Sequence, residues 1–226
     1  MAIISNNMKS ILLGIFMLGL IIPAHAADDE DLCAPFKDAN IDQNILSLML
    51  KAATDGDLYR VTPGSSRMGF CINSPVGKVE AKFLQFKGGL ALNDFMQQGT
   101  SLIQIDVDSL ETDSGLIEAM LKGESFFDSE QYPNITFVST GIEWIEDKKG
   151  VLKGNLTMHG VTKAVAFYVE LKKTGIKSGK EMVTVKATTT IQRSEFGMYT
   201  LSPMVDDRVS LCMTIDAYRH DSSAAI

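Results

Sequence analysis

The chain has 226 residues, of which 45% are hydrophobic and 22% charged, and a formal net charge of −7 at neutral pH. This composition is sufficient for a hydrophobic core and excludes disorder over the whole chain. The negative charge argues against a polyanionic partner, so we expect no nucleic acid to bind.

The first 26 residues have the features of a cleavable signal peptide. Lys9 gives a positive start, residues 11–22 form an apolar run, and Ala24-His25-Ala26 places small residues where a signal peptidase reads. The run is short for a bilayer-spanning helix, which needs about twenty residues, so a retained anchor is the less favoured alternative. Cleavage would leave 226 − 26 = 200 residues and, because Lys9 is the only charge removed, a net charge of −8. We therefore expect a periplasmic protein with no integral membrane segment after cleavage.

Residues 27–56 form an N-terminal extension in this interpretation. After an acidic lead, Asn40 is a suitable cap for an amphipathic helix that ends at Gly56. Its apolar positions recur at helical spacing: Ile41, Ile45, Leu48, Met49 and Ala52. The sequence leaves the role of this extension open.

From Tyr59 onward the hydrophobic period changes to two, which is the spacing of half-buried strands. Such alternation indicates some eight strands, with turns that include Asn73-Ser74-Pro75 and Lys87-Gly88-Gly89, and one short helix over residues 115–122. The pattern predicts an all-β, antiparallel fold over residues 57–220, followed by a tail, residues 221–226. A meander of this kind forms a sandwich or a barrel. A barrel of about eight strands has an interior that holds either its own side chains or one slender ligand.

The segment from Gly123 to Thr140 joins a helix end to a strand. Gly123 suits the left-handed position after a helix, and Pro133 suits the start of a strand, because proline cannot donate to a ladder. Phe126 and Phe127 are unusual in a polar connection. They either plug the end of the core or line the mouth of a ligand site.

The sequence shows little catalytic chemistry. His159 stands beside a turn glycine and His220 near the end of the chain, and neither accompanies a serine elbow, a carboxylate pair or a second metal-type ligand. Both histidines are expected to be solvated. We therefore expect neither an enzyme nor a metal site.

Three linked motifs carry a family resemblance. They are Phe126-Phe127-Asp128 with Tyr132-Pro133 and the strand to Thr140, then the run from Gly154 through His159-Gly160 to Lys163, then Arg193-Ser194-Glu195-Phe196-Gly197-Met198. In order and spacing these resemble the YceI-like polyisoprenoid-binding family over roughly residues 57–219. The resemblance implies an exported, lipocalin-like barrel that sequesters a long isoprenoid tail, of the quinone or polyprenyl phosphate type, non-covalently and without catalysis. The helix before the aromatic pair departs from the family because it is mostly apolar and lacks a histidine.

The alternation and the resemblance together define a set of expected ligand-binding residues. Ten belong to apolar strand faces and are expected inside the barrel: Phe70, Phe83, Ile103, Ile105, Phe137, Leu156, Met158, Phe167, Leu211 and Met213. Five belong to connections and are expected at the mouth: Phe126, Phe127, Phe196, Met198 and Tyr199. The same alternation also fits a barrel filled by its own side chains.

Three classes of function follow from these features. A carrier of a prenyl lipid requires a long dry pocket and no cofactor other than the bound lipid, and this class is favoured. An enzyme requires convergent polar groups, which the sequence does not show. A periplasmic interaction or stress-response module requires a filled barrel and an exposed apolar patch, for which residues 41–53 are the candidate. A homodimer is left open.

The exported part contains three cysteines, Cys33, Cys71 and Cys212, in a compartment that favours pairing. Cys71 belongs to the first barrel strand and Cys212 to the last, and closure of a barrel makes those strands neighbours. Both cysteines are on the polar face, so a disulfide between them would fasten the seam from outside. A register slip of two residues would prevent it. There are two alternatives: a disulfide between Cys33 and the cysteine of either strand, or no disulfide at all.

Overall fold

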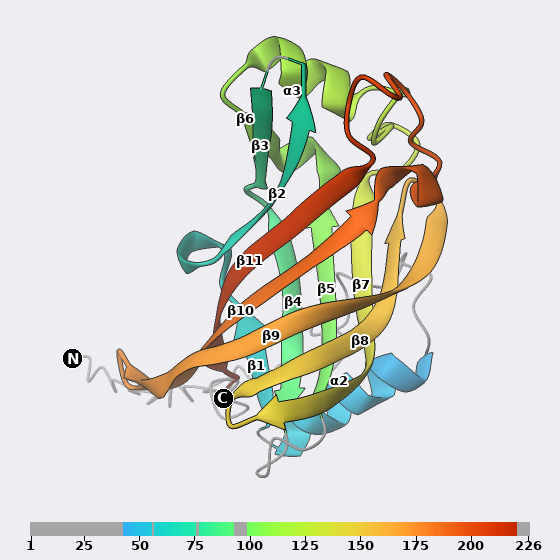
Figure 1. Ribbon diagram of the computed structural model, residues 1–226. Helices are drawn as coiled ribbons and strands as arrows, with labels where there is room; N and C mark the ends of the chain where they lie inside the picture. Colours follow the sequence, from blue (N-terminus) through green and yellow to red (C-terminus); the bar gives the residue numbers. More distant parts are fainter. Residues whose placement is uncertain (1–42, 56, 76, 93–98, 221–226) are drawn as a thin grey trace, which may run out of the picture.

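The computed structural model describes residues 43–55, 57–75, 77–92 and 99–220 (Figure 1). The predicted signal peptide, Cys33, most of the predicted extension and the C-terminal tail lie outside these residues. The described part is all-β with two α-helices, α2 (Gln43–Asp55) and α3 (Gly115–Lys122). Its strands are β1 (Leu58–Val61), β2 (Arg67–Ser74), β3 (Gly77–Phe83), β4 (Phe86–Leu92), β5 (Gly99–Asp106), β6 (Leu110–Thr112), β7 (Asn134–Glu146), β8 (Lys149–Met158), β9 (Val161–Lys177), β10 (Lys180–Gln192) and β11 (Arg208–Arg219).

Eight of these strands close into an antiparallel barrel, as the sequence predicts. Their order is β1-β4-β5-β7-β8-β9-β10-β11, and β11 pairs with β1 to complete the ring. The first half of β11 instead pairs with β2, which continues to β3 and β6. These three strands extend the barrel wall at the end that carries α3, drawn at the top of Figure 1.

The strands form where the apolar alternation predicts them. On β7, Ile135, Phe137 and Ser139 are buried on one face, and Pro133 directly precedes the strand, as expected. The tight β8–β9 turn uses His159 and Gly160, both with positive φ, which is the backbone that a two-residue hairpin needs. Inward-facing residues from β2, β7, β8, β9 and β11 share the main hydrophobic cluster, so the core of the protein is the inner wall of the barrel.

Two local predictions were wrong. Lys87-Gly88-Gly89 is not a turn, because all three residues belong to β4. A Cβ atom on Gly88 would lie 2.2 Å from the carbonyl oxygen of Leu102, so glycine is required there by the close approach of β5. Gly123 ends α3 with an extended backbone, φ −70° and ψ 167°, and not in the left-handed region.

Helix α2 covers the outside of the barrel at the lower end of Figure 1. Its buried residues Met49, Ala52 and Ala53 pack on Leu58 of β1 and Leu102 of β5. The apolar face of this helix is therefore used in packing against the strands. Asn40 and Ile41 lie outside the described residues.

A separate cluster closes the lower end of the barrel. Leu171, Val183 and Ala217 are buried there, with Tyr59 and Leu90 packed against them. Among the described residues, this cluster fills the lower end of the interior, and the solvent-exposed part of the interior wall lies at the other end, where α3 and the connection between β10 and β11 lie (Figure 1).

Candidate ligand-binding cavity

The barrel encloses a cavity of about 580 Å³, a volume within the range of small-molecule sites. Its wall is built from β2, β3, β4, β5, β7, β8, β9, β10 and β11, together with α3 and the connections at the upper end. Apolar side chains make up almost all of this wall. The interior is therefore a dry space suited to a hydrocarbon, and its own side chains do not fill it.

Thirteen of the fifteen expected ligand-binding residues line this cavity. They are Phe70, Phe83, Ile103, Ile105, Phe126, Phe127, Phe137, Leu156, Met158, Phe167, Met198, Leu211 and Met213. Phe196 and Tyr199 do not line it. Phe196, the last residue of η4 (Arg193–Phe196), is fully buried and so does not lie at an open mouth. Tyr199 is 66% exposed in the connection before β11 but does not line the cavity wall.

Phe126 and Phe127 are buried and also line the cavity, so both interpretations of this pair hold in part. The ring of Phe127 packs on Phe70 at 5.7 Å and on Phe83 at 6.1 Å between centroids. Two backbone hydrogen bonds hold the pair beneath the end of α3. The N–H of Phe127 donates to the carbonyl oxygen of Leu121, and the N–H of Phe126 donates to that of Gly123. The two rings therefore form part of the upper wall.

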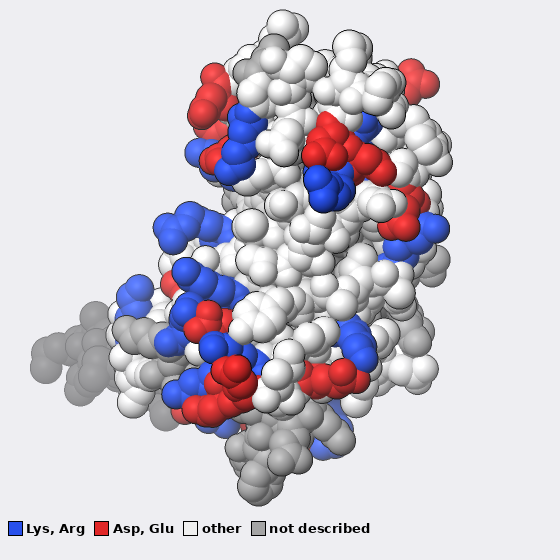
Figure 2. Space-filling model, viewed as in Figure 1, with Lys and Arg blue, Asp and Glu red and all other residues white. Residues whose placement is uncertain are grey.

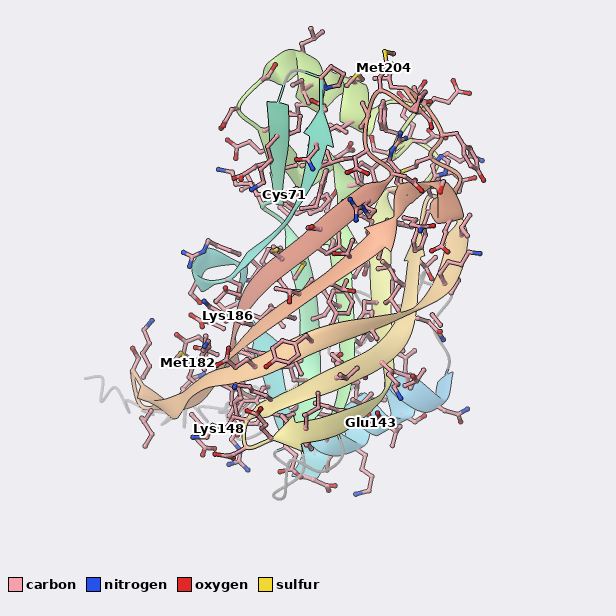
Figure 3. All side chains as sticks on the ribbon, in the orientation of Figure 1. Cys71, Glu143, Lys148, Met182, Lys186 and Met204 are labelled. Carbon is pink, nitrogen blue, oxygen red and sulfur yellow. The ribbon has the colours of Figure 1, made fainter. Side chains whose placement is uncertain are left out.

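The opening of the cavity is marked by the lining residues that are exposed to solvent. All of them lie at the upper end, on α3, on the β2–β3 turn or in the connection before β11: Pro75, Leu116, Met120, Leu201 and Met204. Leu116 is 83% exposed and Met204 63%. Figure 3 shows Met204 in that connection, and Figure 2 shows uncharged atoms at the very top of the molecule, with acidic and basic patches just below and beside them. We call these five residues the apolar rim.

Sequence reasoning missed most of the apolar rim. The available signal was the run Leu116-Ile117 and Met120-Leu121 in a helix that the same reasoning described as mostly apolar. Only Leu121 of α3 is fully buried, so the helix has more apolar residues than its packing needs. That excess indicates an additional role for the exposed face.

Charged groups beside the apolar rim are tied to local partners. Lys122 donates to Glu118 at 2.8 Å and holds the pKa of that carboxyl below its usual value. The backbone N–H of Arg208 donates to Asp206 and lowers the pKa of that carboxyl as well. Both acids are therefore ionised at neutral pH, and each has a hydrogen-bond donor beside it.

Arg193 is the single charged residue on the cavity wall among the described residues, and it is only 3% exposed. Its guanidinium donates to the carbonyl oxygens of Met198 at 2.7 Å, Asp206 at 3.0 Å and Val205 at 3.2 Å. These three bonds hold the connection that carries Leu201 and Met204. Arg193 therefore positions one side of the cavity mouth.

Two serines place hydroxyl groups in the opposite half of the barrel. Ser101 lines the cavity, and its backbone N–H donates to Ser139 Oγ at 2.6 Å. Both side chains are buried, Ser101 at 4% and Ser139 at 2% exposure. No sequence pattern distinguished these serines from other small residues on a strand.

The three sequence motifs meet below the mouth. The ring of Tyr132 packs edge-on against His159 at 5.1 Å, and His159 Nδ1 donates to the carbonyl oxygen of Phe196 at 3.0 Å. A Cβ atom on Gly160 would lie 2.7 Å from the Tyr132 ring, so glycine is needed there. The expectation that His159 is simply solvated was wrong, because its ring joins two connections. At the second histidine, His220, the backbone N–H donates to the carbonyl oxygen of Leu58.

The expected disulfide between Cys71 and Cys212 is not formed, and both are free thiols. Strands β2 and β11 are neighbours as predicted, but Cys71 lies opposite Ser210 and Cys212 opposite Gly69. The cysteines are thus two residues out of register, a diagonal separation of about 7–8 Å that exceeds disulfide range. Neither lines the cavity, and Figure 3 shows Cys71 on β2.

Within the described ranges, no cluster of His, Cys, Asp or Glu is arranged to hold a metal ion. The two helices of the same ranges are also too short or too polar to cross a bilayer.

The described residues form a closed antiparallel barrel around an apolar cavity, which is the architecture of the lipocalin-like class. The YceI-like domain family matches residues 59–217, and the chain belongs to that family.

Proteins similar to this chain come from several bacteria. A UPF0312 protein of Pseudomonas putida strain F1 is 29% identical over 122 residues, which cover 53% of this chain and 64% of the relative. Another, from Shewanella sp. strain W3-18-1, is 26% identical over 148 residues, covering 62% and 75%. The match thus spans less than two thirds of the length of the Pseudomonas relative.

Solved structures show the same fold. BcnA of Burkholderia cenocepacia superposes with a TM-score of 0.63 at 23% identity, covering 69% of this chain and 98% of BcnA. A polyisoprenoid binding domain from Saccharophagus degradans, implicated in plant cell wall breakdown, superposes with a TM-score of 0.55 at 13% identity, covering 71% and 98%.

Proposed function

We propose that this protein is an exported, non-catalytic carrier that holds a long isoprenoid chain in the barrel. The observation that carries the proposal is the apolar cavity of about 580 Å³ together with the apolar rim. The polyisoprenoid-binding relative of similar fold supports the choice of lipid. The signal peptide pattern in residues 1–26 supports a periplasmic location.

The cavity wall favours hydrocarbon over polar ligands. Burial of hydrocarbon contributes about 0.8 kcal/mol per CH₂ group, and therefore about 4 kcal/mol for each five-carbon unit. Association costs about 4–15 kcal/mol, so a few isoprene units are sufficient for net binding. Because the wall is almost uniformly apolar, we expect selection by chain length and width.

The alternative of a filled barrel and an exposed interaction helix has less support. Side chains leave the interior open, and α2 buries Met49, Ala52 and Ala53 against the strands. An enzymatic role also has less support, because Arg193 is the only charged residue on the described cavity wall and its guanidinium is engaged with backbone carbonyls.

The test is native mass spectrometry of the protein purified from a bacterial envelope, followed by extraction and analysis of the bound lipid. We expect one prenyl lipid per chain. In parallel, lipid-stripped protein is titrated with squalene, a hydrocarbon built of isoprene units. If the purified protein carries no lipid and the stripped protein takes up neither squalene nor an added polyprenol, the carrier function is wrong.

A further inference from the structure

One polar atom on the cavity wall lacks a partner. Ser101 Oγ is buried and makes no hydrogen bond, whereas the backbone N–H of the same residue donates to Ser139 Oγ. A buried hydroxyl without a partner loses its hydration without compensation, and native proteins rarely retain one. Alanine at this position would avoid that cost in the empty barrel. The hydroxyl therefore points to a partner that arrives with the ligand.

Ser101 lies at the closed end of the cavity. It is opposite Leu90 on β4, and Leu90 packs on the cluster of Leu171, Val183 and Ala217 that closes the barrel. The apolar rim lies at the other end of the interior. Any group that reaches Ser101 has therefore passed the length of the cavity.

The surroundings of Ser101 favour a neutral group. No ionised side chain among the described residues lines the closed end, since Arg193, the one charged residue on the wall, follows β10 at the upper end. An anionic phosphate at Ser101 would be buried without a counter-charge, which is strongly unfavourable. A carbonyl or hydroxyl oxygen, by contrast, needs only the one hydrogen bond that the serine offers.

We propose that Ser101 binds the polar end of the ligand, and that this end is a neutral carbonyl or hydroxyl, as in a prenylated quinone or a prenyl alcohol. The lipid lies with its oxygen-bearing end at the closed end of the barrel and its hydrocarbon tail toward the apolar rim. This inference rests on the carrier function proposed above. It adds the class of headgroup and the direction of the bound chain.

The experiment measures the affinity of lipid-stripped protein for four probes of similar chain length: a prenylated benzoquinone, a prenyl alcohol, a prenyl diphosphate and squalene. Ser101→Ala is expected to weaken quinone and alcohol binding about fivefold, the equivalent of one neutral hydrogen bond, and to leave squalene unchanged. Ser129→Ala removes a buried hydroxyl outside the cavity and is the matched control, with no expected change for any probe.

Two further measurements separate a binding role from a structural one. Ser101→Ala is expected to raise the melting temperature of the lipid-free protein, because it removes the unpaired hydroxyl, although it lowers quinone affinity. The infrared carbonyl stretch of bound quinone is expected at lower frequency in wild type than in Ser101→Ala. Ser101→Thr keeps the hydroxyl and should preserve that lower frequency.

The outcomes are distinguishable. If squalene binds but Ser101→Ala changes neither quinone affinity nor the carbonyl stretch, Ser101 is not the anchor and the carrier function stands. Tighter binding of the diphosphate than of the quinone, unaffected by Ser101→Ala, would place the headgroup elsewhere and overturn the proposed orientation. Failure of all four probes to bind would overturn the carrier function, and this inference with it.

Discussion

Phe137 of β7 and Phe167 of β9 pack edge to face inside the barrel, with ring centroids 5.2 Å apart. Both rings are buried and both line the cavity, so they belong to the protein core and to the ligand surface together. A substitution here changes stability and binding at once, and only a graded series separates the two effects.

Phe167→Leu is expected to destabilise the protein by about 1–2 kcal/mol, through loss of the aromatic pair and incomplete filling of the space. The folded variant should still retain lipid, with a shift toward wider or longer chains. Phe167→Asp should abolish retention, because it buries an unpaired charge. Urea unfolding and analysis of extracted lipid check both variants. Equal lipid content in the Asp variant would show that the chain does not contact this ring.

The apolar rim should control lipid transfer. Leu116→Glu and Met204→Glu are expected to slow uptake of a fluorescent prenyl analogue from vesicles several-fold, because each places a charge at the opening. Both side chains are exposed, so stability should change by no more than about 0.5 kcal/mol. Ile145→Glu, an exposed apolar position at the far end of β7, is the matched control. Tyr199→Ala should also leave the rate unchanged, since Tyr199 lies outside the cavity.

Transfer rates that are the same in wild type, Leu116→Glu and Met204→Glu would exclude the rim as the route of entry. A rate that falls equally in Ile145→Glu would show a general effect of added charge on vesicle contact, and the rim would lose its special role.

Arg193 should be important for stability because it holds the connection beside the mouth. Arg193→Met keeps much of the side-chain volume but leaves three carbonyl oxygens without their donor, so we expect a loss of about 3 kcal/mol in the free energy of unfolding. Amide hydrogen exchange should accelerate across residues 198–207. Arg208→Met, with a side chain 75% exposed, is the control and should cost no more than about 0.5 kcal/mol. Equal costs for the two variants would contradict this role.

Alternation of apolar residues was sufficient to predict the antiparallel strands and most of the inner wall, because facing a dry interior imposes period two on every strand. The choice of a barrel over a sandwich came from the family resemblance, since both architectures show the same alternation. It failed where backbone approach determines the residue. Gly88 was interpreted as part of a turn, although it is a strand residue that the carbonyl of Leu102 approaches closely. Phe196 and Tyr199 were placed at the mouth, but solvent exposure within a connection depends on tertiary packing that a pattern does not encode.

The register between neighbouring strands was the other feature that the sequence pattern could not predict. Which strands are neighbours follows from closure of the barrel, but the offset between β2 and β11 depends on side-chain packing along the whole seam. The pairing of Cys71 and Cys212 required a particular offset, and the actual register differs from it by two residues. For the same reason, Ser101 and Ser139 could not be recognised as opposite each other.

The register of this seam can be tested with cysteine chemistry. In the wild-type protein, peptide mapping under non-reducing conditions is expected to show no link between Cys71 and Cys212. In the double variant S210C/C212S, the thiol at position 210 lies directly opposite Cys71, at a Cα separation of about 4.5–5.5 Å, and a disulfide should form.

That engineered link would join strands far apart in sequence, so the chain-entropy account predicts stabilisation by about 5 kcal/mol before strain is subtracted. The single variant C212S is the control and should unfold at the same urea concentration with and without reductant. A Cys71–Cys212 peptide from wild type, together with no link in S210C/C212S, would show that the seam has slipped by two residues in solution. A linked peptide that contains Cys33 would instead attach the N-terminal extension to the barrel wall and leave the register of β2 and β11 as it is in the structure.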